Sequence, residues 1–160
     1  MNAAPDIAEG NLADLACVMD VMEAAFEPRY GEAWTASQCA GLLAMPGVWL
    51  TLARDEGELI GFSLARVVAG EAELLLLAVR PDSRGRGIGK SLVEHFHGAA
   101  RSRGADRLHL EVRDGNPAVK LYENSGFTIV GRRRRYYSGA QGELYDALSL
   151  SRPAGTDSAN

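Results

Sequence analysis

Residues 74–90 read LLLLAVRPDSRGRGIGK, and this stretch decides which fold the sequence predicts. The four leucines at its start, residues 74–77, favour a strand that is buried on both faces. A glycine-rich loop follows them, and residues 87–103 then carry the apolar spacing of a helix. A buried strand, a loop and a helix are therefore expected in immediate succession.

The loop combines glycines and cations in a pattern that is typical of an anion site. Glycine allows tight backbone bends and lets a ligand approach without a Cβ atom in the way. Unpaired amides and the dipole at the start of the following helix favour negative charge. We expect this loop to bind a pyrophosphate through Arg84, Gly85, Arg86, Gly87, Ile88, Gly89 and Lys90.

Two other phosphate-binding loops fit this stretch less well. A dinucleotide-binding fold places its glycine loop after the first strand of a parallel sheet, whereas this loop follows several expected strands. A Walker loop needs a glycine five residues before Gly89, and Arg84 occupies that position. A tight turn with a solvated basic rim is the remaining alternative, and the loop alone leaves it open.

The rest of the chain predicts an α+β fold. Capping patterns at Asn11 and Thr35 start two helices, and Pro28 ends the first of them. The elements form a mixed, mostly antiparallel sheet of about six to seven strands flanked by about four helices. We expect one domain over residues 1–151 and a disordered tail over 152–160. The expected helices cover 11–26, 35–44, 87–103 and 116–125, and the expected strands cover 48–54, 58–68, 72–79, 108–112, 128–135 and 143–150.

Charge is distributed unevenly along the 160 residues, whose formal net charge is −4. Residues 1–60 contain ten acidic and two basic side chains, and residues 61–160 contain eleven acidic and fifteen basic ones. The basic part is expected to meet an anionic ligand and the acidic part a cationic one. A strand over the arginines at 132–135 would divide them between its two faces, so no nucleic-acid binding is expected.

Several other classes of protein are not expected. No run approaches the ~18 apolar residues of a membrane-spanning helix, and residues 1–10 lack the pattern of a secretory signal. Cys17 and Cys39 are expected to be buried free thiols, which fits a reducing cytoplasm. The three histidines have no metal-ligand spacing, so no metal site is expected.

Glu111 and Tyr122 form a candidate acid–base pair. Glu111 lies in the apolar strand at 108–112, where a carboxylate is costly unless it has a partner or a role. Tyr122 lies in the next helix, which can pack back on that strand. Transfer of an acyl group to an amine needs a base for the amine and an acid for the leaving group. An edge ion pair of Glu111 with Arg107 or Arg113, and simple packing of Tyr122, are the alternatives.

The motif Arg84-x-x-Gly87-x-Gly89 resembles the acetyl-CoA loop of the GCN5-related N-acetyltransferase (GNAT) superfamily. The later segment LYENSGF, residues 121–127, is similar to the same superfamily. The closing segment RRYYSGAQGELYDA, residues 134–147, resembles the ending of its ribosomal-protein-alanine N-acetyltransferase branch (RimI type). The resemblance covers roughly residues 5–150, which is far more context than a glycine loop alone provides.

The resemblance implies a GNAT fold with acetyl-CoA as co-substrate and no metal. It implies that Glu111 is the general base and Tyr122 the general acid, in a direct attack without a covalent enzyme intermediate. The acceptor pocket is expected to include Tyr30, Trp34 and Tyr137. The acetyl and pantetheine arm is expected on the backbone of the preceding strand and beside a helix cap, at Leu77, Ala78, Val79 and Asn116.

The same branch implies that the acceptor is an N-terminal amine of a protein, specifically the alanine of a ribosomal protein. Two alternatives stay open on the sequence. One is an acetyltransferase for a small amine, a polyamine or a lysine on the same fold. The other is a noncatalytic sensor that binds acyl-CoA.

Overall fold

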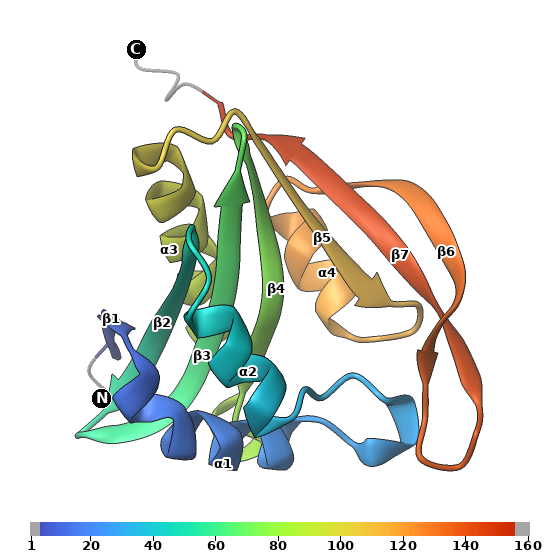
Figure 1. Ribbon diagram of the computed structural model, residues 1–160, viewed down its shortest axis with the longest axis horizontal. Coiled ribbons are helices and arrows are strands. Elements are labelled where there is room, and N and C mark those ends of the chain that lie inside the picture. The colour runs from blue at the N-terminus through green and yellow to red at the C-terminus, as the bar shows by residue number, and fades with distance from the viewer. Residues whose placement is uncertain (1–3, 156–160) are drawn as a thin grey trace.

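The computed structural model describes residues 4–155, and within that range the chain forms seven strands and four α-helices (Figure 1). Three short 3-10 helices, η1 to η3, join them. In chain order the elements are β1 (Asp6–Gly10), η1 (Leu12–Asp14), α1 (Leu15–Ala25), η2 (Pro28–Tyr30), α2 (Ala36–Leu43), β2 (Val48–Asp55), β3 (Glu58–Val68), β4 (Glu71–Val79), η3 (Pro81–Ser83), α3 (Ile88–Ser102), β5 (Arg107–Arg113), α4 (Ala118–Asn124), β6 (Thr128–Ser138) and β7 (Leu144–Pro153).

All seven strands form one sheet in the order β1-β2-β3-β4-β5-β7-β6. In the described part of the chain every neighbouring pair is antiparallel except β4 and β5, which are parallel and joined through α3. Helices α1 and α2 lie on one face of the sheet, and α3 and α4 lie on the other (Figure 1). The predicted α+β class and the mostly antiparallel sheet are confirmed.

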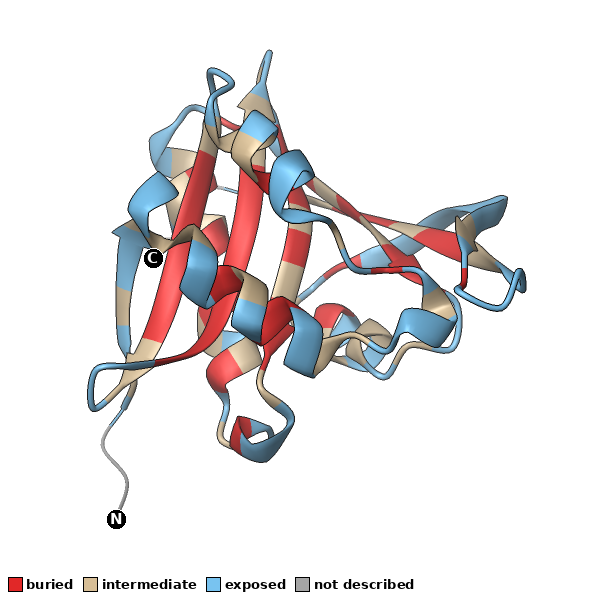
Figure 2. Cartoon of the chain, turned by 60° about the horizontal axis from the view of Figure 1, so that its bottom comes forward, coloured by how far each residue is buried: buried red, intermediate tan, exposed pale blue. Residues whose placement is uncertain are grey.

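The two faces of the sheet bury separate apolar clusters. Val21, Met22 and Phe62 are fully buried beneath α1, and Phe96 and Leu110 are fully or almost fully buried on the α3 side. Each such side chain contributes about 1.5–3 kcal/mol relative to an exposed position. Figure 2 shows buried residues along the central strands and on parts of the helices, whereas the outer end of the β6–β7 hairpin is mostly exposed. The two clusters therefore hold the centre of the sheet in place, including the parallel pair β4 and β5 and the strands beside it.

The parallel pair β4 and β5 separates part of the way along its length. Pairing runs from Glu71 with Arg107 to Leu74 with Leu110 and then stops. Close to that point the register of β4 against β3 skips Leu75, because Ala65 faces Leu74 and Leu64 faces Leu76. Such a bulge bends the strand locally. The remaining residues of β4 and β5 diverge and leave a cleft between them.

This divergence changes the expected environment of the four leucines. Leu74 and Leu76 are buried, as a strand covered on both faces would require. All four leucines line the cleft, but Leu75 and Leu77 are only half-buried. The prediction of burial on both faces was therefore wrong at these two positions, and the cause is the local separation of β4 from β5.

The predicted helix boundaries rest on caps that the structure contains. The Thr35 hydroxyl accepts a hydrogen bond from the Gln38 amide at 3.1 Å, and the Gln38 side chain accepts one from the Thr35 amide at 2.8 Å. The same reciprocal arrangement joins Asn11 and Asp14. At the end of α4, Gly126 has a φ of 95°, the left-handed conformation with which many helices end.

Three expectations need correction. Strand β1 was not predicted, because its five residues carry no clear alternation of apolar side chains. Cys17 is exposed on α1, and only Cys39 is buried as expected. The expected tail from residue 152 is not disordered at its start, because β7 continues to Pro153 and Ala154 is 2% exposed. Residues 156–160 lie outside the described residues.

Candidate active site

A cleft of about 960 Å³ occupies the space between the diverging ends of β4 and β5. Its two halves are lined by different parts of the chain. The cofactor half consists of the end of β4, the glycine loop and the start of α3. The acceptor half consists of the segment before α2, the end of β5 and the β6–β7 hairpin. Besides Glu111 and Tyr122, fourteen residues were expected at the site, and thirteen of them line the cleft. They are Leu77, Ala78, Val79, Arg84, Gly85, Gly87, Ile88, Gly89, Lys90, Asn116, Tyr30, Trp34 and Tyr137.

The glycine loop has the shape that an anion site needs. Gly85 and Gly87 have φ values of 81° and 78°, and Gly87 is the cap residue that precedes α3. A Cβ atom placed on either residue would meet nothing within 4 Å, so the space above the loop is open to a ligand. Gly89 has another role, because its Cβ would lie 3.1 Å from Leu121 of α4. The third glycine allows α3 and α4 to pack closely.

The three cations of the loop differ in what they contact. The Arg84 guanidinium donates to the carbonyl oxygens of Val79 at 3.3 Å and Ala25 at 3.1 Å, so it ties the loop to β4 and to α1. Lys90 lies in the first turn of α3 and lines the cleft. Arg86 does not line the cleft, because its guanidinium pairs with Asp55 at 3.1 Å. The Arg86 side chain is therefore turned away from the cleft in which the pyrophosphate is expected.

Glu111 lies on β5 just beyond the last residue that pairs with β4, so its side chain faces the cleft. Its carboxylate contacts the Arg133 guanidinium at 2.7 Å and accepts a hydrogen bond from the Ser149 hydroxyl at 3.0 Å. The Glu111 side chain is 14% exposed, whereas that of Arg133 is 63% exposed. The alternative that Glu111 forms an ion pair is thus realised with Arg133, and not with Arg107 or Arg113.

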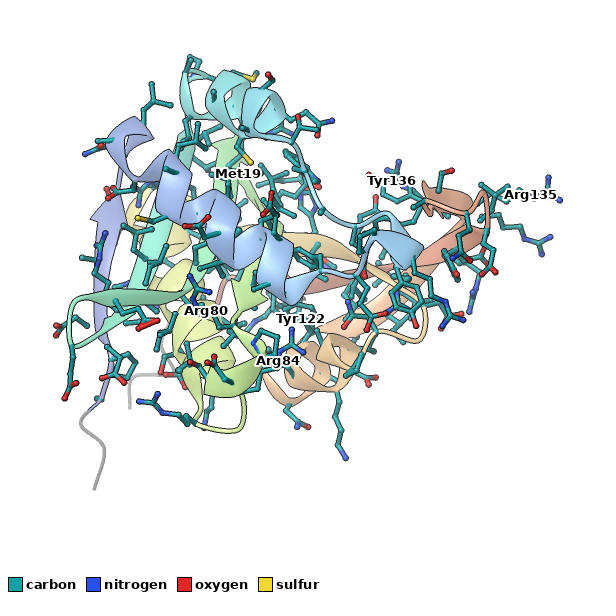
Figure 3. All side chains as sticks on the ribbon, turned by 90° about the horizontal axis from the view of Figure 1, so that it is seen from below. Met19, Arg80, Arg84, Tyr122, Arg135 and Tyr136 are labelled. Atoms are coloured by element: carbon teal, nitrogen blue, oxygen red, sulfur yellow. The ribbon has the colours of Figure 1, made fainter. Side chains whose placement is uncertain are left out.

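Tyr122 lies on α4 and reaches the same cleft, although its side chain is only 6% exposed. Its ring packs edge-on against Phe127, and its hydroxyl has no hydrogen-bond partner among residues 4–155. Burial, and then the negative charge of Glu32, raises the pKa of Tyr122 well above its usual value. The phenol is therefore fully protonated at neutral pH. Figure 3 shows Arg84 and Tyr122 in the same region near the end of α1, while Arg135 points outward from the hairpin.

The acceptor half contains the three aromatic residues that were expected there. Tyr30 and Trp34 come from the segment before α2, and Tyr137 comes from β6. Burial, followed by the charge of Glu32 and smaller effects of other groups, raises the pKa of Tyr137 strongly. Tyr122 and Tyr137 are thus two neutral phenols that face the same cleft.

Two buried charged residues of the acceptor half were not singled out by the sequence. Glu32 and Arg113 are 9% and 8% exposed, and the Arg113 Nε donates to the Glu32 carboxylate at 3.2 Å. Asn116 donates to the other oxygen of Glu32 at 2.7 Å. Glu32 stands in a segment with no motif, and 81 residues separate it from Arg113. No local pattern could have identified this pair.

Within residues 4–155, no group of three or more His, Cys, Asp or Glu side chains is placed to hold a metal ion. Over the same range, no helix has the length and apolar character that crossing a membrane requires.

Comparisons with known proteins agree with the geometry of the site. The acetyltransferase (GNAT) family matches residues 15–127 of this chain. The ribosomal protein bS18-alanine N-acetyltransferase of Salmonella typhimurium is 41% identical over 105 residues, which cover 65% of this chain and 70% of that protein. The N-alpha-acetyltransferase RimI of Mycobacterium tuberculosis is 38% identical over 123 residues, which cover 72% of this chain and 73% of that protein.

A solved structure extends the similarity to nearly the whole chain. The ribosomal-protein-S18-alanine N-acetyltransferase from Escherichia coli superposes with a TM-score of 0.83 at 29% identity, over 98% of this chain and 97% of that one. The cradle of Gly85, Gly87 and Lys90 is open in the way that a pyrophosphate requires. The chain therefore belongs to the GNAT family and is an acetyl-CoA-dependent N-acetyltransferase.

Proposed function

We propose that this enzyme acetylates the N-terminal amine of a protein, and that its preferred acceptor is the N-terminal alanine of a ribosomal protein. The names of the similar proteins from Salmonella, Mycobacterium and Escherichia support this acceptor. The observation that carries the chemistry is that a carboxylate, Glu111, and an unpartnered buried phenol, Tyr122, face one cleft. Such a pair can move both of the protons that acetyl transfer to an amine requires.

Glu111 is the proposed general base. The reference pKa of an α-amine is about 7.7–8.0, so an acceptor is largely protonated at neutral pH and must lose a proton before it attacks. The Ser149 hydroxyl fixes one side of the carboxylate, and the exposed Arg133 side chain covers the other. Movement of Arg133 into solvent frees a carboxylate oxygen for the acceptor ammonium without any change in β5.

Tyr122 is the proposed general acid. Its neutral phenol can donate a proton to the thiolate that leaves when the amine displaces CoA. Because no described side chain accepts a hydrogen bond from Tyr122, the hydroxyl is available to the sulfur. The pantetheine arm would lie along the free edge of β4 at Leu77, Ala78 and Val79, which directs the thioester toward the end of β5.

The acceptor is tested with a panel of peptides and free amines and scored by mass spectrometry. The panel contains an alanine-initiated peptide, the same peptide with a formylated N-terminus, a peptide with an internal lysine, and spermidine. We expect one added acetyl group on the N-terminus of the first peptide and none on its formylated partner. Acetylation of lysine or spermidine at a comparable kcat/KM would instead support the alternative acceptors.

A noncatalytic sensor is distinguished by replacing the proposed base. Glu111→Gln should lower kcat by about 10²–10⁴-fold while acetyl-CoA still binds, since general-base catalysis contributes on this scale. Glu123→Gln on the exposed face of α4 is the matched control and should keep its activity. Equal turnover in the two variants would reject Glu111 as the base, and no turnover by the unchanged enzyme with any amine would favour the sensor.

A further inference from the structure

Glu32 is a buried carboxylate in the cleft that the proposed acid–base chemistry does not use. It lies between η2 and α2, and its two oxygens accept hydrogen bonds from Arg113 at 3.2 Å and from Asn116 at 2.7 Å. A buried charge is costly unless it is paired and hydrogen-bonded, and Glu32 is both. The two residues that it joins differ in position: Arg113 ends β5 in the acceptor half, whereas Asn116 precedes α4, which packs against α3 of the cofactor half.

The segment that carries Glu32, residues 27–34, is here called the acceptor loop because Tyr30 and Trp34 line the acceptor half. The Arg113 guanidinium lies 3.6 Å from the centre of the Tyr30 ring, so Arg113 holds this loop through a ring contact as well as through Glu32. A guanidinium that stacks on a ring and forms an ion pair at once cannot be replaced by a lysine without losing one of the two contacts. The loop is therefore fastened to the end of β5 at two neighbouring points.

The other side of the acceptor loop is fixed against the β6–β7 hairpin. The Ala140 amide donates to the Pro28 carbonyl at 3.0 Å. A Cβ atom on Gly31 would lie 2.0 Å from the Ser138 carbonyl oxygen, so the two backbones cross in direct contact. The hairpin fixes one side of the acceptor loop. The hydrogen bonds of Glu32 fix its other side, which faces the cleft.

Asn116 links this arrangement to the cofactor half. Its side-chain nitrogen donates to Glu32, and its side-chain oxygen accepts from the Ala118 amide at 2.8 Å at the start of α4. The same side chain lines the cleft together with the glycine loop, and α4 carries Tyr122. A ligand that contacts Asn116 can therefore affect the acceptor loop, because Asn116 also donates a hydrogen bond to Glu32 of that loop.

We propose that Glu32 is a positioning residue that couples the two halves of the cleft: when acetyl-CoA or CoA occupies the cofactor half, Asn116 and Glu32 hold the acceptor loop in its binding geometry. The acceptor then binds more tightly to the CoA-bound enzyme than to the free enzyme. The proposal rests on the proposed function, because it takes a peptide N-terminus as the acceptor. The nearness of the Glu32 charge to Tyr122 and Tyr137 supports a position at the junction of the two halves, since it contributes to the raised pKa of both phenols after burial.

The test is the dissociation constant of an alanine-initiated peptide, measured by calorimetry with and without saturating CoA, which cannot donate an acetyl group. In the unchanged enzyme CoA should tighten peptide binding by about 5-fold or more, the lower end of measured couplings between sites. Glu32→Gln should reduce this factor to within about twofold of unity. The matched control Glu23→Gln, an exposed position on α1, should keep the full factor.

A purely structural role for Glu32 would give another result. If Glu32→Gln weakens peptide binding equally with and without CoA, the coupling factor is unchanged and the proposal is overturned. An unchanged enzyme whose peptide affinity does not respond to CoA would also overturn it. Mass spectrometry of the unchanged enzyme with the same peptide distinguishes a failure of the coupling proposal from a failure of the proposed function. If the peptide is not acetylated at all, the proposed acceptor is rejected.

Folding is controlled with a second variant. Glu32→Gln leaves the Arg113 charge buried with a neutral partner, and this can destabilise the chain. The double variant Glu32→Met with Arg113→Met removes both charges and keeps most of the side-chain volume, and such replacements are often tolerated. It should melt cooperatively and still lack the response to CoA. A double variant that keeps the full coupling factor would reject the role of Glu32.

Discussion

The two halves of the cleft are built in different ways. The cofactor half comes from one continuous stretch, residues 77–90, and its central groups are backbone amides held open by Gly85 and Gly87. The acceptor half is assembled from side chains that are distant in sequence, and Glu32 and Arg113 are 81 residues apart. The first half depends on local backbone conformation, whereas the second depends on contacts that only the complete fold provides.

This difference has a consequence for the way each half responds to change. A site made of backbone groups accepts many side chains, provided that the glycines with positive φ remain. A site made of interlocked side chains changes when any one member changes, because the others lose their partners. Substitutions in the two halves should therefore affect the KM of different substrates.

The largest effect on turnover is expected for Tyr122, which lies where the cofactor half meets the acceptor half. Tyr122→Phe should lower kcat by about 10²–10⁴-fold and leave both KM values within about twofold, because the hydroxyl acts on the leaving thiolate and not in binding. Burial raises the pKa of Tyr122, so the unchanged enzyme should lose no activity through its ionisation below pH 10. Steady-state kinetics between pH 6 and 10 provide the measurement. A change confined to KM would instead indicate that Tyr122 only packs.

A methyl group on Gly31 should disturb the acceptor half selectively. The residue has a φ of 68°, and its Cβ would lie 2.0 Å from the Ser138 carbonyl oxygen. Overpacking of this kind costs about 1–3 kcal/mol, so the loop must move away from the hairpin. Gly31→Ala should raise the acceptor KM about tenfold or more, since about 1.4 kcal/mol corresponds to tenfold.

The acetyl-CoA KM of Gly31→Ala is the informative second measurement. It should stay within about twofold of the unchanged enzyme when assayed below the melting temperature, because Gly31 lies outside the stretch 77–90 that forms the cofactor half. A parallel rise of both KM values would mean that the crossing of the two backbones supports the whole cleft.

Gly87 gives the reverse experiment in the cofactor half. A Cβ there meets no protein atom within 4 Å, so Gly87→Val adds bulk only to the space that the pyrophosphate would occupy. The left-handed conformation adds about 1–2 kcal/mol of strain for a residue with a Cβ. A valine side chain in this space hinders the approach of the pyrophosphate to the backbone, so the acetyl-CoA KM should rise about tenfold or more, the equivalent of about 1.4 kcal/mol, while the acceptor KM changes little.

A matched control exists on the same helix. Gly98 lies on the exposed side of α3, and a Cβ placed on it also meets nothing within 4 Å. Gly98→Val should leave both KM values unchanged and should not lower the melting temperature, because valine has a higher helix propensity than glycine. If the Gly87 and Gly98 variants behave alike, the open space above the loop is not the pyrophosphate site.

The same contrast explains how much the sequence could predict. The strand, loop and helix at 74–90, the cap at Thr35 and the fold class followed from local patterns, and the structure contains them. Glu111 could be singled out as a candidate, because an apolar strand rarely carries a carboxylate without a partner or a role, and the structure shows it both at the cleft and paired with Arg133. These features depend on neighbours in the chain.

The features that could not be predicted depend on the separation of β4 from β5 and on long-range contacts. The half-burial of Leu75 arises where the pairing of β4 with β5 ends and the register against β3 skips a residue. The pair of Glu32 with Arg113 needs the acceptor loop to lie against β5. The partner of Arg86 is Asp55 on β2, and no spacing in the loop reveals it.

The smallest predicted effects are on the acetyl-CoA KM, and they distinguish Lys90 from Arg86. Lys90 lies in the first turn of α3, where a positive charge is unfavourable beside the helix dipole unless an anion is bound there. Lys90→Gln should therefore raise the acetyl-CoA KM by about twofold to fivefold, and this difference should shrink as salt screens the charge. Arg86→Gln removes an equal charge four residues away along the chain, but the Arg86 guanidinium is turned toward Asp55. Its acetyl-CoA KM should change by less than about twofold at low salt. Equal effects of the two variants would mean that the cofactor half attracts its ligand through net charge rather than through the side chains that line it.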